Sequence, residues 1–81
     1  MKADEMFKNL GYEKCSAIDD EEYITFSRRT ERYIEYIIFD KIEKSIKSWK
    51  CCHCCNTIKD KAINMQELQA INKKCEELGW K

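Results

Sequence analysis

The central stretch of the sequence reads Tyr33-Ile34-Glu35-Tyr36-Ile37-Ile38-Phe39, and it determines the fold class. Aromatic and β-branched residues dominate this stretch, as is typical of a β-strand. Because successive strand side chains point to opposite faces of a sheet, one face carries Tyr33, Glu35, Ile37 and Phe39, and the other carries Ile34, Tyr36 and Ile38. Both faces are therefore apolar, which predicts either a strand covered on both sides or a sheet with one exposed apolar face.

Further strands are predicted on both sides of this stretch. Residues 23–27 alternate, with Ile24 and Phe26 on one face, and residues 28–32 form the predicted turn to the central strand. Residues 40–44 form a second connection to residues 45–52. Although Ile42, Ile46 and Trp49 also have helical spacing, the residue types of this last segment favour a strand. A short edge strand is predicted over residues 12–18, followed by the acidic turn of residues 19–22.

Helices are predicted at both ends of the chain. Over residues 2–10, the apolar face consists of Ala3, Met6, Phe7 and Leu10, and Gly11 suits the left-handed stop position. Over residues 65–78, Asn64 and Glu67 have capping-box spacing, Gly79 provides the stop, and Trp80 is expected to fold back onto the helix. The predicted buried face is Met65, Leu68, Ile71, Cys75 and Leu78, with Lys73, Lys74, Glu76 and Glu77 facing water.

The predicted fold is α+β: a small antiparallel meander of about four strands, flanked by an N-terminal and a C-terminal helix. The chain has 81 residues, no proline and two glycines, so residues 1–81 are expected to form a single domain. Residues 1–5 show no apolar signal-peptide core, and the longest apolar run, residues 36–39, is far shorter than the ~20 residues that span a bilayer. These features predict a cytoplasmic protein that does not enter the membrane.

The charge balance argues against two classes of protein. The sequence has 15 Lys and Arg residues and 15 Asp and Glu residues, for a net charge of zero. A strongly basic nucleic-acid binder and a strongly acidic nucleic-acid mimic are both disfavoured by this balance. No arrangement of residues typical of a catalytic site is present, which favours a protein that is not an enzyme.

Three segments resemble one family of proteins. They are Met-Lys-Ala-Asp-Glu-Met-Phe-Lys-Asn-Leu-Gly-Tyr-Glu (residues 1–13), Thr-Glu-Arg-Tyr-Ile-Glu-Tyr-Ile-Ile-Phe (residues 30–39) and Ile-Asn-Met-Gln-Glu-Leu-Gln-Ala-Ile-Asn-Lys-Lys-Cys-Glu-Glu-Leu-Gly-Trp (residues 63–80). The chain resembles small, uncharacterised proteins of phages and prophages from low-GC Gram-positive bacteria. This resemblance implies a phage or prophage origin and a bacterial host. It carries over no catalytic or binding residue, and the cysteine run is not part of the shared pattern.

Five consecutive residues form the candidate metal site: Cys51, Cys52, His53, Cys54 and Cys55. They contain two overlapping C-x-x-C pairs, a spacing that lets two thiolates reach one zinc ion. A structural zinc site needs four ligands, however, and only the single residues Cys15 and Cys75 remain elsewhere. The alternatives are zinc within one chain, a soft metal shared by two chains, or a cysteine-rich loop without a metal; the last is favoured. Thiol catalysis with His53 as base lacks a third, orienting group.

A basic cluster and nearby tyrosines raise the alternative of weak nucleic-acid binding. Arg28, Arg29 and Arg32 lie in the predicted turn, and Tyr33 and Tyr36 are candidates for stacking on bases. Lys41, Lys44, Lys47 and Lys50 follow, but acidic residues alternate with them. A mixed-charge surface exposed to solvent is the favoured interpretation, so nucleic acid is not the expected partner.

The leading hypothesis is protein binding through an exposed apolar sheet face. The expected anchors are aromatic and arginine side chains: Tyr23, Arg28, Arg29, Arg32, Tyr36 and Trp49. The expected partner is a host or phage protein, with a homodimer as a further option. Together with the resemblance, this predicts a phage or prophage accessory protein that counters a bacterial defence system, for example as an inhibitor of a CRISPR nuclease.

Overall fold

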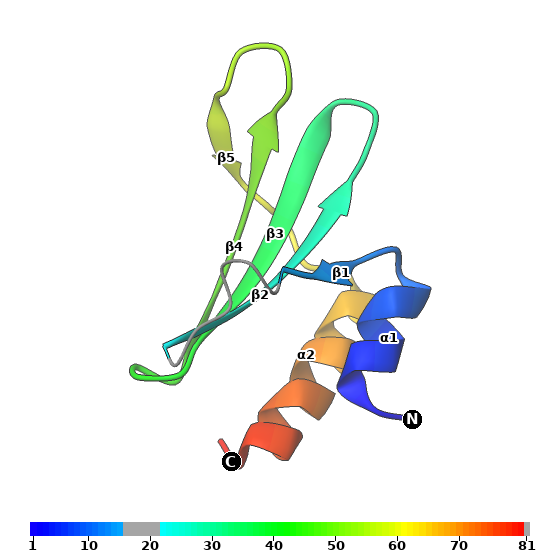
Figure 1. Ribbon diagram of the computed structural model, residues 1–81, viewed down its shortest axis with the longest axis vertical. Helices are drawn as coiled ribbons and strands as arrows, with labels where there is room; N and C mark the ends of the chain where they lie inside the picture. Colours follow the sequence, from blue (N-terminus) through cyan, green and yellow to red (C-terminus); the bar gives the residue numbers. More distant parts are fainter. Residues whose placement is uncertain (16–21, 81) are drawn as a thin grey trace.

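The computed structural model describes residues 1–15 and 22–80 as two helices and a five-stranded antiparallel sheet. In chain order the elements are α1 (Ala3–Asn9), β1 (Glu13–Lys14), β2 (Tyr23–Arg29), β3 (Tyr33–Asp40), β4 (Ser45–Cys52), β5 (Ile58–Asp60) and α2 (Met65–Leu78). The strands lie in the sheet in the same order as in the chain, so each pairs with its sequence neighbour (Figure 1). The predicted α+β meander with a helix at each end is confirmed, with five strands where about four were expected.

The strands differ from the prediction in several places. Asp40, predicted to begin the second connection, is the last residue of β3. Arg28 and Arg29 belong to β2 and pair with Glu35 and Ile34, so the turn is shorter than residues 28–32. The edge strand is reduced to Glu13–Lys14; residues 16–18 of that prediction, and residues 19–21 of the acidic turn, lie outside the described residues. No sequence signal predicts β5, because all three of its residues are exposed and show no apolar alternation. Residues 45–52 form the predicted strand β4.

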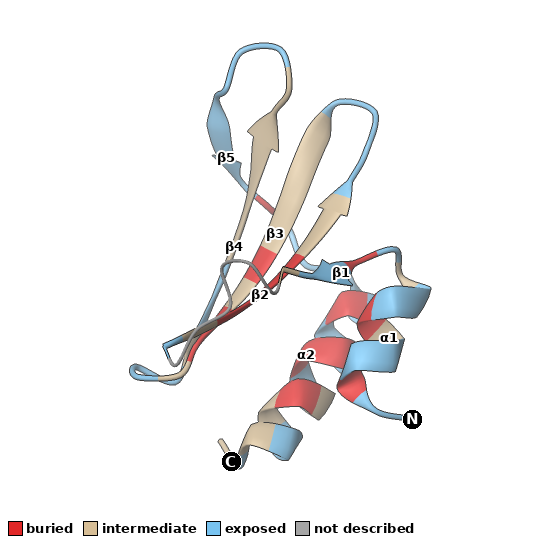
Figure 2. Ribbon diagram, viewed as in Figure 1, coloured by how far each residue is buried: buried red, intermediate tan, exposed pale blue. Residues whose placement is uncertain are grey.

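The sheet has two distinct faces, and both helices pack on the same one. Phe7 of α1 and Ala70 and Ile71 of α2 contact a cluster of strand residues formed by Ile24, Phe26, Ile37 and Phe39. Within this core the rings of Phe7 and Phe26 are stacked with centroids 4.2 Å apart. Figure 2 shows the buried segments gathered where the helices meet β2 and β3, while β5 is exposed.

Helix α2 begins and ends as the sequence predicts, but a different face is buried. The Asn64 side chain accepts a hydrogen bond from the Glu67 N–H, and the Glu67 carboxylate accepts one from the Asn64 N–H, which completes the capping box. Gly79 ends the helix with φ +74°. Met65 is 69% exposed and Leu68 39% exposed, whereas Glu67, Ala70, Ile71 and Lys74 are buried. The predicted apolar stripe is therefore wrong at the start of the helix, and so is the exposure of Lys74.

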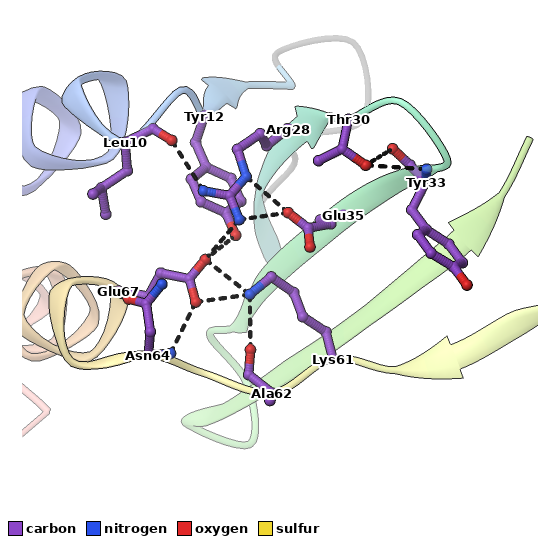
Figure 3. A network of polar contacts seen from close by, with 10 residues as sticks. All are labelled: Leu10, Tyr12, Arg28, Thr30, Tyr33, Glu35, Lys61, Ala62, Asn64 and Glu67. Atoms are coloured by element: carbon purple, nitrogen blue, oxygen red, sulfur yellow. Dashed lines mark hydrogen bonds and ion pairs between the residues drawn. The ribbon is translucent and has the colours of Figure 1, made fainter.

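A buried polar network explains why the buried face of α2 is rotated (Figure 3). The Glu67 carboxylate receives hydrogen bonds from Lys61 at 2.7 and 2.8 Å, from the Tyr12 hydroxyl, and from Arg28 at 3.2 Å. Arg28 also donates to Glu35 at 2.7 Å. This network connects α2 to the chain before β1, to β2 and β3, and to the segment after β5. In the first turn of α2 the buried side chain is therefore the charged Glu67, where apolar periodicity alone predicts Leu68.

Burial and polar contacts shift the pKa values of several groups in the network, among them Glu67 and Tyr12. Burial raises the pKa of the Glu67 carboxyl, but hydrogen bonds from Lys61, Tyr12 and the Asn64 N–H outweigh burial and hold this pKa below its ordinary value. Burial and the hydrogen bond to Glu67 raise the pKa of the Tyr12 phenol. At neutral pH the network therefore contains an ionised carboxylate and a protonated phenol that donates to it.

Candidate protein-binding face

The side of the sheet opposite the helices forms a largely apolar surface, which we call the open face. Strand alternation and the register define it. Four rows of paired residues cross this face: Tyr23–Asp40–Ser45, Thr25–Ile38–Lys47, Ser27–Tyr36–Trp49–Asp60, and Arg29–Ile34–Cys51–Ile58. Neither helix packs on this face, since both pack against the opposite set of side chains. The open face thus carries the second apolar side of β3 that the sequence analysis identified.

Tyr36 and Trp49 lie at the centre of the open face. They are direct partners in the β3–β4 register, and their ring centroids are 6.2 Å apart with an interplanar angle of 54°. Both side chains are half-buried, so each ring keeps an accessible surface. Aromatic side chains held in this way have few conformations left to lose on binding, which favours them as interface anchors.

Two neighbouring depressions lie beside Trp49 on the open face. The first is lined by Tyr23, Thr25, Ile38, Lys47 and Trp49. The second is lined by Thr25, Tyr36, Ile38, Trp49, Cys51 and Ile58. Thr25, Ile38 and Trp49 belong to both, so the two depressions form one grooved apolar region. Such a region can accept apolar side chains of a protein partner.

Charged residues surround this apolar region. A third depression on the same face includes Glu13, Arg29, Ser27 and Tyr36, so acidic and basic groups lie at the β1 side. At the β5 side Asp60 pairs in register with Trp49. Lys47 lies on β4, where its Nζ is 3.9 Å from a carboxylate oxygen of the buried Asp40 of β3. An apolar centre with a charged rim is the arrangement found in many protein–protein interfaces.

The six predicted anchor residues do not form one site. Tyr36, Trp49, Tyr23 and Arg29 share the open face. Arg32 is exposed in the turn between β2 and β3, where its carbonyl accepts a hydrogen bond from the His53 N–H. Arg28 points to the helix side, with its guanidinium bound to Glu35, Glu67 and the Leu10 carbonyl. The structure therefore gives Arg28 a role in folding and separates it from the other anchors.

The sequence analysis did not name several residues of the open face as site residues. Ile34 and Ile38 share a strand face with Tyr36, a relationship that alternation alone predicts. The positions of Ile58 and Asp60 depend on the β4–β5 pairing, and β5 carried no sequence signal. The signal that identifies the complete face is the strand register, which composition does not reveal.

The basic residues do not form a continuous surface for nucleic acid. Lys47 lies on the open face, whereas the Lys50 ammonium lies 4.6 Å from the centre of the Tyr33 ring on the opposite face. Tyr33 and Tyr36, the two tyrosines considered for base stacking, lie on opposite faces of β3. Lys44 lies in the β3–β4 turn with φ +56°. This distribution matches the mixed-charge surface favoured in the sequence analysis.

The cysteine run forms the tip of the β4–β5 hairpin. Cys51 and Cys52 end β4 on opposite faces, and Cys54 and Cys55 are exposed in the following turn. The His53 ring is held by the Thr30 carbonyl, which lies 3.1 Å from Nε2. In residues 1–15 and 22–80, no group of three or more His, Cys, Asp or Glu side chains is positioned to hold a metal ion. The structure thus offers no observation in favour of the zinc alternative.

The chain was also compared with known proteins and with the requirements for crossing a membrane. No helix among the described residues has the length and hydrophobicity that a membrane span requires. The chain matches no protein-family model, no curated protein and no solved structure. The geometry of the open face and the sequence itself are therefore the basis for a function.

Proposed function

We propose that this chain is a non-enzymatic accessory protein of phage or prophage origin, which acts in the bacterial cytoplasm by binding a host protein through the open face. The observation that carries this proposal is the apolar centre formed by Tyr36, Trp49, Ile34, Ile38 and Ile58. Among the described residues, these side chains lie outside the core cluster on which the helices pack. A contiguous apolar surface on a small domain is typical of a binding site that a partner covers.

The charges at the rim favour a different protein over a second copy of this chain. The central row ends in Glu13 at β1, beside Ser27, and in Asp60 at β5. If two copies pack face to face about a twofold axis through Tyr36, acidic ends meet acidic ends, whether the axis runs along or across the strands. Juxtaposed like charges oppose association. We therefore expect a partner with an apolar centre and basic groups opposite Glu13 and Asp60.

The resemblance to small phage and prophage proteins supports the choice of partner. A phage protein without catalytic groups acts by occupying a surface of a host protein, and bacterial defence nucleases are targets for which such blocking is useful to a phage. On this basis the partner is a component of a bacterial defence system, for which a CRISPR nuclease is the specific candidate.

The experiment that tests this proposal is a plating assay in a low-GC Gram-positive host whose CRISPR nuclease targets an infecting phage. The host expresses this chain, the Tyr36→Ala/Trp49→Ala double variant, or a Tyr33→Ala control. Tyr33 is an aromatic residue of the same strand but lies on the opposite face, so it controls for loss of an aromatic ring. The unmodified chain and Tyr33→Ala should restore plaque formation, and the double variant should not.

Binding to the purified nuclease gives the matching physical measurement. Removal of two interface aromatics weakens a typical complex by at least about 100-fold, while circular dichroism should show that the double variant stays folded. No protection by the unmodified chain would refute the CRISPR target. Equal protection by the chain and the folded double variant would refute the open face as the binding surface.

A further inference from the structure

The tip of the β4–β5 hairpin brings two of its cysteines to the same side of one turn. The Asn56 N–H donates to the Cys52 carbonyl at 3.0 Å, and the Cys52 N–H donates to the Thr57 carbonyl at 3.0 Å. The first of these bonds spans four residues, as in a single turn of helix. Residues three apart on such a turn lie on the same side, so the turn places Cys55 over Cys52.

The contacts of the two thiols make Cys55 the more reactive one. The Cys55 Sγ lies 3.0 Å from the Thr57 hydroxyl, and the Cys52 side chain is close enough to affect the pKa of the Cys55 thiol. The Thr57 hydroxyl, the Thr57 backbone, Cys52 and the positive charge of Lys59 lower the pKa of the Cys55 thiol. Cys55 is exposed, whereas Cys52 is half-buried. An accessible thiol is thus paired with a partner thiol close to it on the same turn.

We propose that Cys52 and Cys55 form a reversible dithiol–disulfide site that reacts with low-molecular-weight disulfides. The Cys55 thiolate attacks one sulfur of the small disulfide, forms a mixed disulfide and releases one small thiolate. The Cys52 thiolate, after losing its proton to solvent, attacks the Cys55 sulfur of the mixed disulfide. This step forms the Cys52–Cys55 bond and releases the second small thiolate. The protein loses two electrons, and the small disulfide gains them.

The other cysteines of the run are excluded by their positions. Cys51 lies on the open face, on the opposite side of β4 from Cys52, and its Sγ is 3.8 Å from the Cys52 carbonyl oxygen. Cys51 and Cys54 have the same sequence spacing as Cys52 and Cys55. Cys51, however, lies on the other side of the sheet from Cys52. Cys54 is exposed on the same turn as Cys55, which makes this pair a matched internal control.

The test uses the full chain with two double variants. Cys51→Ser/Cys54→Ser keeps only the proposed pair in the run, and Cys52→Ser/Cys55→Ser keeps only the control pair. Each reduced protein is equilibrated without oxygen in mixtures of reduced and oxidised glutathione, then quenched with acid, alkylated with N-ethylmaleimide and digested with trypsin. Mass spectrometry follows the peptide of residues 51–59, which contains no cysteine from outside the run.

The first variant should lose two hydrogen atoms from this peptide and take up no N-ethylmaleimide, and added dithiothreitol should reverse the change. The control variant should carry N-ethylmaleimide or glutathione on each cysteine. In a Cys52→Ser single variant, the mixed disulfide with glutathione should accumulate at Cys55. Equal formation of an internal disulfide in both double variants would overturn the proposal, as would a folded first variant that keeps two free thiols in excess oxidised glutathione.

Discussion

Lys61 and Glu67 form a buried ion pair in which the Lys61 Nζ lies 2.7 and 2.8 Å from the two carboxylate oxygens of Glu67. The side chains are only 4% and 1% exposed, and Tyr12 and Arg28 complete the hydrogen bonding of the carboxylate. The pair joins the segment after β5 to the first turn of α2. It therefore helps hold α2 against the helix side of the sheet.

Glu67→Gln should destabilise the protein by about 3 kcal/mol, because removing one partner of a buried ion pair leaves the other charge uncompensated. Glutamine retains the capping-box geometry, so the loss reports the charge and not the cap. Urea unfolding followed by tryptophan fluorescence gives the change in free energy. The control is Lys73→Met, which removes an exposed ion pair with Glu76 at 3.9 Å and should cost under about 0.5 kcal/mol. Similar small losses for both variants would contradict the structural role of Glu67.

The stabilisation from Glu67 should depend on pH. Its pKa is lower in the folded state than in the unfolded state, so the folded state binds fewer protons. The stabilisation is fully present above the unfolded carboxyl pKa of about 4.3 and is lost as the pH falls through the lower, folded-state pKa. The stability difference between the unmodified chain and Glu67→Gln should be constant from pH 7 to 5 and shrink below pH 4. A difference that grows on acidification would contradict this assignment.

The ends of α2 could be predicted from the sequence, and so could the burial of Ile71, but the buried side of its first turn could not. The capping box of Asn64 and Glu67 and the helix stop at Gly79 depend on local backbone geometry, which neighbouring residues determine. The burial of Glu67 and Lys74 depends on partners far along the chain: Tyr12 for Glu67, and for Lys74 the Asp4 carboxylate at 3.1 Å. Apolar periodicity counts Leu68 and ignores such pairs, so it favours the wrong side of the first turn.

The open face, like α2, is determined partly by local sequence and partly by contacts between separate elements. Alternation along β3 places Ile34, Tyr36 and Ile38 together, and the strand prediction for residues 45–52 makes Trp49 available to join them. The register that sets Tyr36 opposite Trp49, and the position of β5, come from chain pairing. The arginines show the limit most clearly, because Arg28 and Arg29 are neighbours in sequence but lie on opposite faces of β2.

These two arginines should therefore respond differently to substitution. Arg28→Ala removes hydrogen bonds to Glu35 and Glu67 and should cost about 2 kcal/mol of stability. Arg29→Ala removes an exposed side chain at the rim of the open face and should change stability by under about 0.5 kcal/mol, while it weakens partner binding. Urea unfolding and a binding titration separate the two effects. Equal destabilisation by both substitutions would count against the assignment of opposite faces.

The stability of the protein should not depend on a bound metal. No three ligand side chains are gathered among residues 1–15 and 22–80, and Cys51 and Cys52 point to opposite sides of β4. Incubation of protein purified in a reductant with a strong chelator should leave the melting temperature unchanged. A large decrease on chelation, reversed by zinc, would instead establish the cysteine run as a structural metal site.

The most direct test of the central claim is site-specific photo-crosslinking in a phage-infected bacterial host. A photoreactive phenylalanine analogue replaces Tyr36 in one version of the protein and Tyr33 in another. These positions lie on the same strand and on opposite faces, so the comparison isolates the open face. We expect a covalent adduct between position 36 and a component of a host defence system, and no such adduct from position 33. An adduct of position 36 with a second copy of this chain, or adducts from position 33 alone, would contradict it.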